Sequence, residues 1–326
     1  MQSLNKSILN IRFYGFWDND SIIFEHYFRP SHNFLFDKYD VKIDYEKPAD
    51  LVLCSLWKPA PNKNIGVPTI CLVHENYTPT QQFCDGYDLT LSFTANPELK
   101  KHQRVPYWVY HAFDAYYFSN SGNSFDKWTK LFLTEQRALD GCKDYDTTRF
   151  CAFLHRKKEN YRTKVVEMLS EYKKVDLGDP SSSNLTDPTE IDLMNKKLEG
   201  KEGFYRKLHF FEPRKFSFCM ENSWTPGYTT EKIIDSYLAP TVPLYCGPLE
   251  VEDNFNSKAF LNMYEYDSVV PFVEDVKKLD NTPELYYSML NEPLFTSYPD
   301  KFRADAMLSL YESVLERKDP EKITLE

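Results

Sequence analysis

Five short apolar segments, rich in β-branched residues and bounded by turn residues, occupy the first third of the chain. They are SILNIRFYG (7–15), YDVKIDY (39–45), ADLVLCSL (49–56), PTICLVHEN (68–76) and YDLTLSF (87–93). Runs of this length and continuity predict strands buried on both faces, as in a parallel sheet that helices cover. Between residues 110 and 145 the sequence becomes polar and aromatic and contains lysines. We expect the boundary between two domains in that region.

A second alternation of strands and helices follows. We predict strands at 149–155, 173–179, 215–222 and 241–247, and helices at 160–174, 229–239, 267–279, 282–291 and 300–317. The stretch that ends near residue 212 is polar and partly helical. Strand and helix alternate in both halves, which predicts two doubly wound α/β domains, residues 1–146 and 147–326.

Composition narrows the class of protein. The chain has 326 residues, and a typical domain has about 100–150, so its length also favours two domains. Hydrophobic residues make up 42% and charged residues 27%, which is typical of a packed soluble protein. The net charge of −10 argues against a nucleic-acid partner, because nucleic-acid affinity depends on neutralising phosphates. A negative net charge does not exclude a local basic pocket that binds one small anion.

The cysteines favour a reducing compartment. There are seven, an odd number, with no CxxC spacing, and several lie inside apolar runs such as LVLCSL and TICLVH. A free thiol in such a run behaves as a small buried hydrophobe, so we expect no disulfide framework. The first residues lack the apolar core of a signal peptide, and no apolar run approaches the ~20 residues that span a bilayer.

Segment 221–232, ENSWTPGYTTEK, is the most informative stretch for chemistry. It follows an expected buried strand and leads into a helix, and helix starts at the carboxyl ends of strands favour anions. Lys232 near a helix start opposes the helix dipole unless an anion binds there. Glu231 could accept two hydrogen bonds from sugar hydroxyls. The alternative is a capping box with a solvated Glu-Lys pair, and local physics does not decide between the two.

The longer string CMENSWTPGYTTEKIIDSYLAPTVPLYCGP (219–248) resembles the donor-site signature of the α1,3/α1,4-fucosyltransferases, glycosyltransferase family 10. The resemblance implies GDP-fucose as the donor, with Lys232 at the diphosphate and Glu231 at the ribose hydroxyls. The donor-binding residues that it implies in this segment are Asn222, Tyr228, Glu231 and Lys232.

A second match lies in RFCAFLHRKKENYRTKVVEMLSEYKKVDLG (149–178), which resembles the family's strand, loop and helix. There an Arg at the start of the helix contacts the diphosphate, and Arg162 stands at that place. A guanidinium presents a planar fork to phosphate oxygens. The alternative is that Arg162 belongs to a solvated basic loop together with residues 156–158.

A third match is ICLVHENYTP (70–79), which resembles the acceptor-domain strand with a catalytic glutamate. It places the general base at Glu75. The family inverts the fucose anomeric carbon, so one carboxylate must deprotonate the acceptor hydroxyl. Without the resemblance, Glu75 is a carboxylate at the end of a strand, and most of these are solvated. His74 could compete as the base, although successive residues of an extended strand face opposite ways.

The triplet Asp18-Asn19-Asp20 mimics the Asp-x-Asp metal site of another glycosyltransferase architecture. We interpret it as a loop and helix cap, and we expect Trp17, Asp18 and His74 to contact the acceptor. Cysteine and histidine spacing typical of zinc is absent. We therefore expect no metal ligands and no required cofactor, while stimulation by Mn²⁺ or Mg²⁺ stays open.

Together these resemblances imply the GT-B architecture, with two Rossmann-like domains facing across a cleft. Residues 1–146 would hold the acceptor, an oligosaccharide or glycoconjugate, and residues 147–326 would hold GDP-fucose. Fucose would move in α1,3 or α1,4 linkage to an N-acetylglucosamine or glucose unit of a Lewis-type or lipopolysaccharide glycan. The alternatives are a transferase of another nucleotide sugar and a catalytically silent glycan- or nucleotide-binding protein on the same fold.

The chain's two ends suggest where the protein works. Some bacterial members of the family end in heptad repeats and a basic amphipathic tail, whereas this chain ends in RKDPEKITLE. We therefore expect at most a weak peripheral membrane association. The start of the chain resembles no membrane anchor, which predicts a cytoplasmic enzyme, at the inner face of the membrane if it associates with one.

Overall fold

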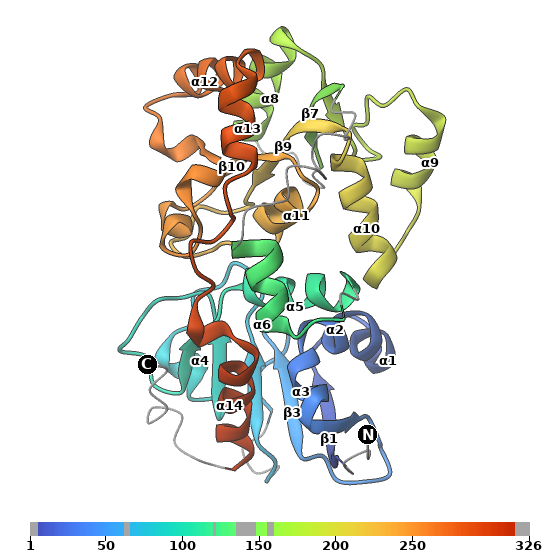
Figure 1. Ribbon diagram of the computed structural model, residues 1–326. Coiled ribbons are helices and arrows are strands. Elements are labelled where there is room, and N and C mark those ends of the chain that lie inside the picture. Colours follow the sequence, from blue (N-terminus) through green and yellow to red (C-terminus); the bar gives the residue numbers. More distant parts are fainter. Residues whose placement is uncertain (1–5, 62–65, 120–121, 135–147, 155–159, 317–326) are drawn as a thin grey trace. The chain divides into compact units, whose positions relative to one another are not determined.

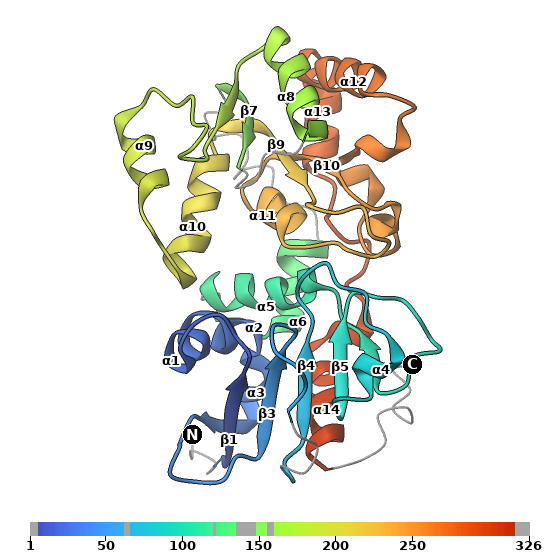
Figure 2. The same ribbon diagram turned by 180° about the vertical axis from the view of Figure 1, so that it is seen from behind.

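A computed structural model describes residues 6–61, 66–119, 122–134, 148–154 and 160–316 (Figure 1). The chain forms two compact units. Unit 1 combines Met1–Asp126 with Pro299–Glu326, and unit 2 is the continuous stretch Lys127–Tyr298. Each unit contains a parallel sheet with helices packed around it (Figures 1 and 2). Two α/β domains were predicted from the sequence, and this fold class is confirmed.

The described strands of unit 1 form a sheet in the order β2-β1-β3-β4-β5-β6, and all of them pair in parallel. They are β1 (Ser7–Tyr14), β2 (Tyr39–Lys42), β3 (Leu51–Ser55), β4 (Thr69–Leu72), β5 (Leu89–Ser92) and β6 (His102–Arg104). The five predicted runs contain β1 to β5. The short edge strand β6 has the sequence HQR and is only half-buried, so it lacks the apolar run that reveals the others.

The helices of unit 1 are mostly short. They are α1 (Asp20–Ile22), α2 (Arg29–Ser31), α3 (Asn33–Lys38), α4 (Gln81–Cys84), α5 (Tyr107–Ser119) and α14 (Ala304–Leu315), with a π-helical turn at Ile23–Phe28. After α5, the chain passes from unit 1 to unit 2 through α6 (Phe125–Trp128) and a π-helical turn at Thr129–Thr134.

Helix α5 corrects one sequence-based expectation. Residues 110–119 were placed in an inter-domain region, but they belong to a helix of unit 1 whose Trp108, Tyr110 and Phe113 are buried. A helix that is buried around most of its circumference is apolar on all sides. It therefore lacks the polar and apolar periodicity by which a helix is recognised in a sequence.

Helix α14 shows why the two units do not divide the chain at residue 146. The helix predicted at 300–317 exists, but it packs in unit 1, where it lies among the blue and cyan elements of Figures 1 and 2. The hydroxyl of Tyr311 lies 2.7 Å from Nε2 of His32, and its ring meets Phe34 edge to face. An amphipathic helix shows that it covers a sheet but not which sheet, so residues 299–316 were assigned to the second domain.

The described strands of unit 2 form a second parallel sheet in the order β11-β10-β9-β7-β8. They are β7 (Arg149–Phe153), β8 (Val175–Leu177), β9 (Arg214–Met220), β10 (Val242–Cys246) and β11 (Leu261–Asn262). The helices are α8 (Asn160–Tyr172), α9 (Pro188–Asn195), α10 (Gly200–Phe211), α11 (Lys232–Leu238), α12 (Val269–Asn281) and α13 (Pro283–Leu290). Short 3₁₀ turns occupy Leu249–Asp253, Ser257–Ala259 and Met263–Glu265.

A buried core joins one face of this sheet to α8, α12 and α13. Phe216 of β9 meets Phe150 of β7 and Tyr286 of α13 edge to face, with ring centroids 5.6 Å apart in both pairs. Such pairs add about 0.5–1.5 kcal/mol to the burial of their rings. Helices α10 and α11 contact β9 as well, and α11 also contacts β10.

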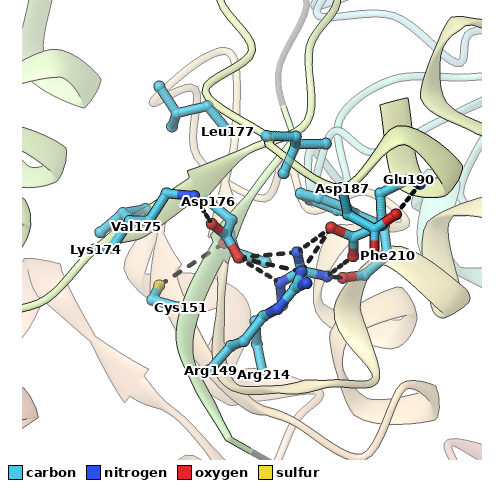
Figure 3. Close-up of polar contacts among 12 residues, drawn as sticks. Arg149, Cys151, Lys174, Val175, Asp176, Leu177, Asp187, Glu190, Phe210 and Arg214 are labelled. Carbon is cyan, nitrogen blue, oxygen red and sulfur yellow. Dashed lines mark hydrogen bonds and ion pairs between the residues drawn. The ribbon is translucent and has the colours of Figure 1, made fainter. Parts of the chain in front are cut away.

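A buried ionic cluster fixes the edge of this sheet at which β7 and β9 begin (Figure 3). The fully buried Arg214 donates from Nε and Nη2 to Oδ2 of Asp176, at 3.0 and 2.8 Å, and its Nη1 lies 2.9 Å from Glu190. Arg149, the first residue of β7, lies 2.6 Å from the same Glu190. Burial would raise the pKa of Asp176, but Lys174 and Arg214 lower it below its usual value.

We predict that Arg214→Met lowers the free energy of unfolding by about 3–5 kcal/mol, because it leaves a buried carboxylate without its main partner. Urea unfolding of the purified chain measures the loss. Arg149→Met is the matched control, since its partly exposed guanidinium contributes about 0–1 kcal/mol. Equal losses in the two variants would contradict the role assigned to the buried arginine.

Candidate active site

The predicted donor residues lie at the edge of unit 2's sheet where the strands end. In an open parallel sheet, ligands bind at this edge, at the point where the strand order reverses. Here the chain moves from β8 on one side of β7 to β9 on the other, so the reversal lies between β7 and β9. The loop 221–231 leaves β9 at that point and leads into α11.

Glu221 is the first residue after β9, and it is 1% exposed. Its Oε1 accepts the backbone N–H of Thr230 at 2.7 Å, and its Oε2 accepts the Thr230 hydroxyl at 2.7 Å. Its own N–H donates to the carbonyl of Cys246, at the end of β10. Glu221 therefore joins the start of the loop to its end at Thr230, and it ties the loop to the end of β10.

Lys232, the first residue of α11, places its ammonium beside this carboxylate. Nζ donates to Glu221 Oε2 at 3.1 Å, to Thr230 Oγ1 at 2.6 Å and to Glu231 Oε1 at 3.4 Å. Burial favours the neutral amine, but Glu221 and Glu231 outweigh burial and raise the pKa of Lys232. The cation is thus held at the start of the helix, and its longest contact, to Glu231, is the one that a ligand displaces at the lowest cost.

Lys207 of α10 extends the row of charges. Its Nζ lies 2.9 Å from Asp235 and 3.9 Å from Oε1 of Glu231. Burial opposes the charge, but Asp235 and Glu231 together raise the pKa of Lys207. Glu221, Lys232, Glu231, Lys207 and Asp235 therefore alternate in sign. The half-buried Glu231 is the central carboxylate of the row, held between two ammonium groups.

Gly247, directly after β10, leaves room for this arrangement. A Cβ at this position would lie 2.5 Å from the Tyr245 hydroxyl oxygen and 2.8 Å from Cγ of Glu221. Both distances are shorter than van der Waals contact, so a side chain at 247 would displace the carboxylate or the ring. The glycine is required by close packing, and the Gly-Pro that ends the predicted signature thus has a steric explanation.

The other predicted donor residues occupy different environments in the same unit. Tyr228 is 3% exposed and lies close enough to Lys232 to contribute to its raised pKa. Asn222 is exposed at the start of the loop. Arg162 lies in the first turn of α8, which follows β7 on the other side of the reversal point; its side chain lies outside the described residues.

Three charged residues of this site were missed from the sequence, namely Glu221, Lys207 and Asp235. Glu221 had a detectable signal, because a glutamate directly after the apolar run FSFCM must be paired if the run is a buried strand. Lys207 had none, since it lies on a polar helix well before the motif. Only the packing of α10 against α11 brings it to Glu231.

In unit 1, Glu75 and His74 follow β4 at the edge where the strands end. Glu75 is exposed, and its carbonyl accepts the N–H of Tyr77 in a turn. The imidazole of His74 packs against the rings of Tyr107 and Tyr110, and among the described residues its buried Nε2 has no hydrogen-bond partner. Burial lowers the pKa of His74 to about 4. The Glu75 carboxylate is therefore open to solvent, whereas Nε2 of His74 is not.

Trp17 and Asp18 follow β1 at the same edge, and both are exposed. Oδ1 of Asp18 accepts the N–H of Asn19 at 2.8 Å, and Oδ1 of Asn19 accepts the N–H of Ile22 at 3.0 Å. The predicted loop and helix cap are therefore present, with Asn19 as the cap. Among the described residues, no group of three or more His, Cys, Asp or Glu side chains could hold a metal ion. No helix in the described ranges is long and apolar enough to cross a membrane.

Comparison with solved structures relates the fold to known enzymes. A crystal structure of an α1,3-fucosyltransferase with GDP-fucose superposes with a TM-score of 0.72 and 21% identity, covering 97% of this chain and 93% of that one. A second crystal structure of an α1,3-fucosyltransferase gives a TM-score of 0.72 and 20% identity, covering 98% of this chain and 93% of that one. The protein therefore has the GT-B fold of these enzymes.

Comparison of sequences identifies the relatives. A putative fucosyltransferase R654 of Acanthamoeba polyphaga mimivirus is 27% identical over 156 residues, which are 47% of this chain and 25% of that protein. The α-(1,3)-fucosyltransferase FucT of Helicobacter pylori is 38% identical over 91 residues, 28% of this chain and 19% of that protein. The chain thus aligns with a quarter or less of the length of these relatives.

The region that carries the resemblance coincides with unit 2. Residues 143–291 match the family described as glycosyltransferase family 10 (fucosyltransferase), C-terminal part. This range contains the whole row of charges from Lys207 to Asp235 and the reversal point of the sheet. In these residues, the chain is similar to the carboxy-terminal part of glycosyltransferase family 10.

Proposed function

We propose that this protein is an inverting fucosyltransferase that moves L-fucose from GDP-fucose to a hydroxyl of a glycan. The accepting unit is an N-acetylglucosamine or glucose, joined in α1,3 or α1,4 linkage. The observation that carries the proposal is the pairing of Glu231 and Lys232 at the sheet reversal of the region that matches family 10. An assay of fucose transfer from radiolabelled GDP-fucose to an acceptor array, run beside GDP-mannose, tests it.

In this proposal, Lys232 meets the diphosphate and Glu231 the ribose. A diphosphate oxygen would replace the 3.4 Å contact between Lys232 and Glu231, while the buried contact to Glu221 keeps the ammonium in place. Glu231 would then stay paired with the ammonium group of Lys207 and accept hydrogen bonds from the ribose hydroxyls. The exposed Asn222 and the buried Tyr228 complete the proposed donor contacts.

Charge arithmetic explains why the proposal also requires Arg162. The row from Glu221 to Asp235 contains three carboxylates and two ammonium groups, so its own sum is negative. A diphosphate needs further positive potential. We expect it from the start of α8, on the other side of the reversal point, through the helix terminus and through Arg162 of the first turn.

On the acceptor side, Glu75 would take the proton of the attacking hydroxyl as the oxygen displaces GDP from the anomeric carbon. Inversion needs one base on the face opposite the leaving group, and an exposed carboxylate at the end of β4 meets that need. Trp17 and Asp18, exposed after β1, are proposed to contact the acceptor. His74 is left out of these contacts, because its Nε2 is buried.

We also propose that the enzyme works in the cytoplasm, with at most a weak peripheral association with the inner face of the membrane. The cysteines that the structure describes support a reducing compartment, because all six are buried and free of disulfides. Burial raises the thiol pKa of Cys54 to about 12, which keeps it protonated and unreactive.

We predict that Lys232→Ala weakens GDP binding by about 10- to 100-fold, because it removes a charge-assisted contact to the diphosphate. Isothermal titration calorimetry measures the affinity. Lys278→Ala, which removes an exposed lysine on α12, should leave it unchanged. Because Lys232 also pairs with the buried Glu221, Lys232→Arg is added as a variant that keeps the charge. Unchanged GDP affinity in a folded Lys232→Ala protein would refute the assigned pocket.

Glu75→Gln should lower turnover by about 10²- to 10⁴-fold, the usual contribution of a general base, and leave GDP affinity unchanged. The amide keeps the shape of the carboxylate but cannot take a proton. Steady-state transfer and calorimetry on the same preparation separate the two quantities. Asp85→Asn changes an exposed carboxylate that precedes β5 and serves as the matched control. Transfer near the wild-type rate would mean that the base lies elsewhere.

Fucose transfer should survive exhaustive treatment with EDTA, with added Mn²⁺ or Mg²⁺ giving at most a stimulation. The positive groups proposed at the diphosphate take the place that a metal ion has in other transferases. The measurement is the transfer rate before chelation, after chelation and after metal is restored. Complete loss with EDTA, rescue by Mn²⁺ and the same loss in Asp18→Asn would contradict the proposal.

A further inference from the structure

The five tryptophans of the chain divide into two groups. Trp108 and Trp128 are buried in helices. Trp17, Trp57 and Trp224 are 57%, 59% and 39% exposed, and they follow the last residues of β1, β3 and β9. An exposed indole leaves a large apolar face in water, and three of them lie just past the ends of strands, where open α/β sheets bind ligands.

Trp17 and Trp57 lie on adjacent loops of unit 1. Their strands, β1 and β3, are neighbours in the sheet (Figure 2). Tyr14 of β1 is opposite Cys54 of β3, and Trp17 and Trp57 each come three residues after these paired residues. The hydroxyl of Ser55 donates to the carbonyl of Gly15. The two loops also touch, because a Cβ at Gly15 would lie 3.1 Å from Cβ of Lys58.

The loop that carries Trp17 is held by aromatic packing. The indole meets the ring of Tyr27 edge to face with centroids 5.4 Å apart, and it contacts Phe16 at 5.8 Å. The ring is therefore supported from one side and open to solvent on another. Such a supported, exposed indole loses little conformational entropy when a ligand stacks on it.

The polar groups beside the two indoles suit a carbohydrate. Asp18 and Asn19 follow Trp17 and are exposed, and Lys58 follows Trp57 and is exposed. A pyranose ring offers an apolar C–H face for an indole and hydroxyl groups around its rim. A carboxylate accepts from such hydroxyls, and an ammonium group donates to them. A lipid or an apolar peptide would remove water from these polar groups without offering them new hydrogen bonds.

We infer that Trp17 and Trp57 form a stacking subsite for a sugar ring of the acceptor other than the ring that receives the fucose. The inference rests on the proposed transfer to a glycan. β3 is the neighbour of β4, whose end carries Glu75, and β1 is the next strand beyond. Adjacent strands are about 5 Å apart, so the two loops start about 5 and 10 Å from the loop of the proposed base. That span accommodates a second pyranose ring.

Kinetics with acceptors of two lengths test the inference. We expect Trp17→Ala and Trp57→Ala each to raise KM about tenfold for an oligosaccharide acceptor, since each loses one stacking face. The rise in KM should be larger for the oligosaccharide than for the single accepting sugar, and GDP affinity should keep its wild-type value. Tyr287→Ala, at an exposed aromatic on α13 of unit 2, is the matched control. Trp57→Phe should recover most of the loss, because it keeps an aromatic face.

A second readout keeps this inference separate from the proposed function. Saturation-transfer NMR with the oligosaccharide and no nucleotide should show contact between its outer ring and the wild-type protein, and none in the double variant. If KM for the long acceptor and the NMR contacts are unchanged in both single variants and in the double variant, the subsite is refuted while fucose transfer stands. If the wild type transfers no fucose but the NMR contact depends on the two indoles, the transferase proposal fails and the sugar subsite stands.

Discussion

The candidate donor site of unit 2 depends on a buried carboxylate, which would be unstable in the protein interior without a partner. Glu221 follows a strand that is buried on both faces, and leaving it unpaired would cost several kcal/mol. Lys232 and the backbone of Thr230 meet that requirement. Satisfying one buried charge therefore sets where the loop turns and where α11 begins, and it determines the direction in which the next side chains point.

The same pairing gives the site its stiffness. Nζ of Lys232 donates to Glu221 at 3.1 Å, and Glu231 lies 3.9 Å from Nζ of Lys207. Groups that are already oriented lose little entropy when a ligand arrives, and they need no reorganisation. Gly247 keeps this arrangement compact, because any larger residue would occupy the space of the carboxylate. The buried pair of Glu221 and Lys232 thus fixes the position of the ammonium group and sets the local electrostatic potential. The half-buried Glu231 stays accessible to a ligand.

Local pattern was sufficient for most of the fold and for the donor segment. The predicted strands correspond to β1 to β5 and β7 to β10, and the parallel sheets follow from them. The edge strand β2, YDVK, buries only Val41, so it is not buried on both faces as predicted. Three features could not be obtained from the sequence, for different physical reasons. Helix α5 is buried around most of its circumference and loses its periodicity. Lys207 reaches Glu231 only through helix packing, and the surroundings of the His74 ring depend on two tyrosines of α5.

The return of α14 to unit 1 has a consequence for how the chain folds during synthesis. Unit 2 is continuous in sequence, whereas unit 1 is interrupted by all of unit 2 and is completed by a helix from the far end. Domains generally fold as units as the chain emerges from the ribosome. Unit 2 can therefore fold before α14 has been synthesised, at a stage when His32 and Phe34 of unit 1 still lack their contacts with Tyr311. Most of unit 1 is synthesised first, but it completes its fold last. During that interval its uncovered core is the surface that a chaperone would bind.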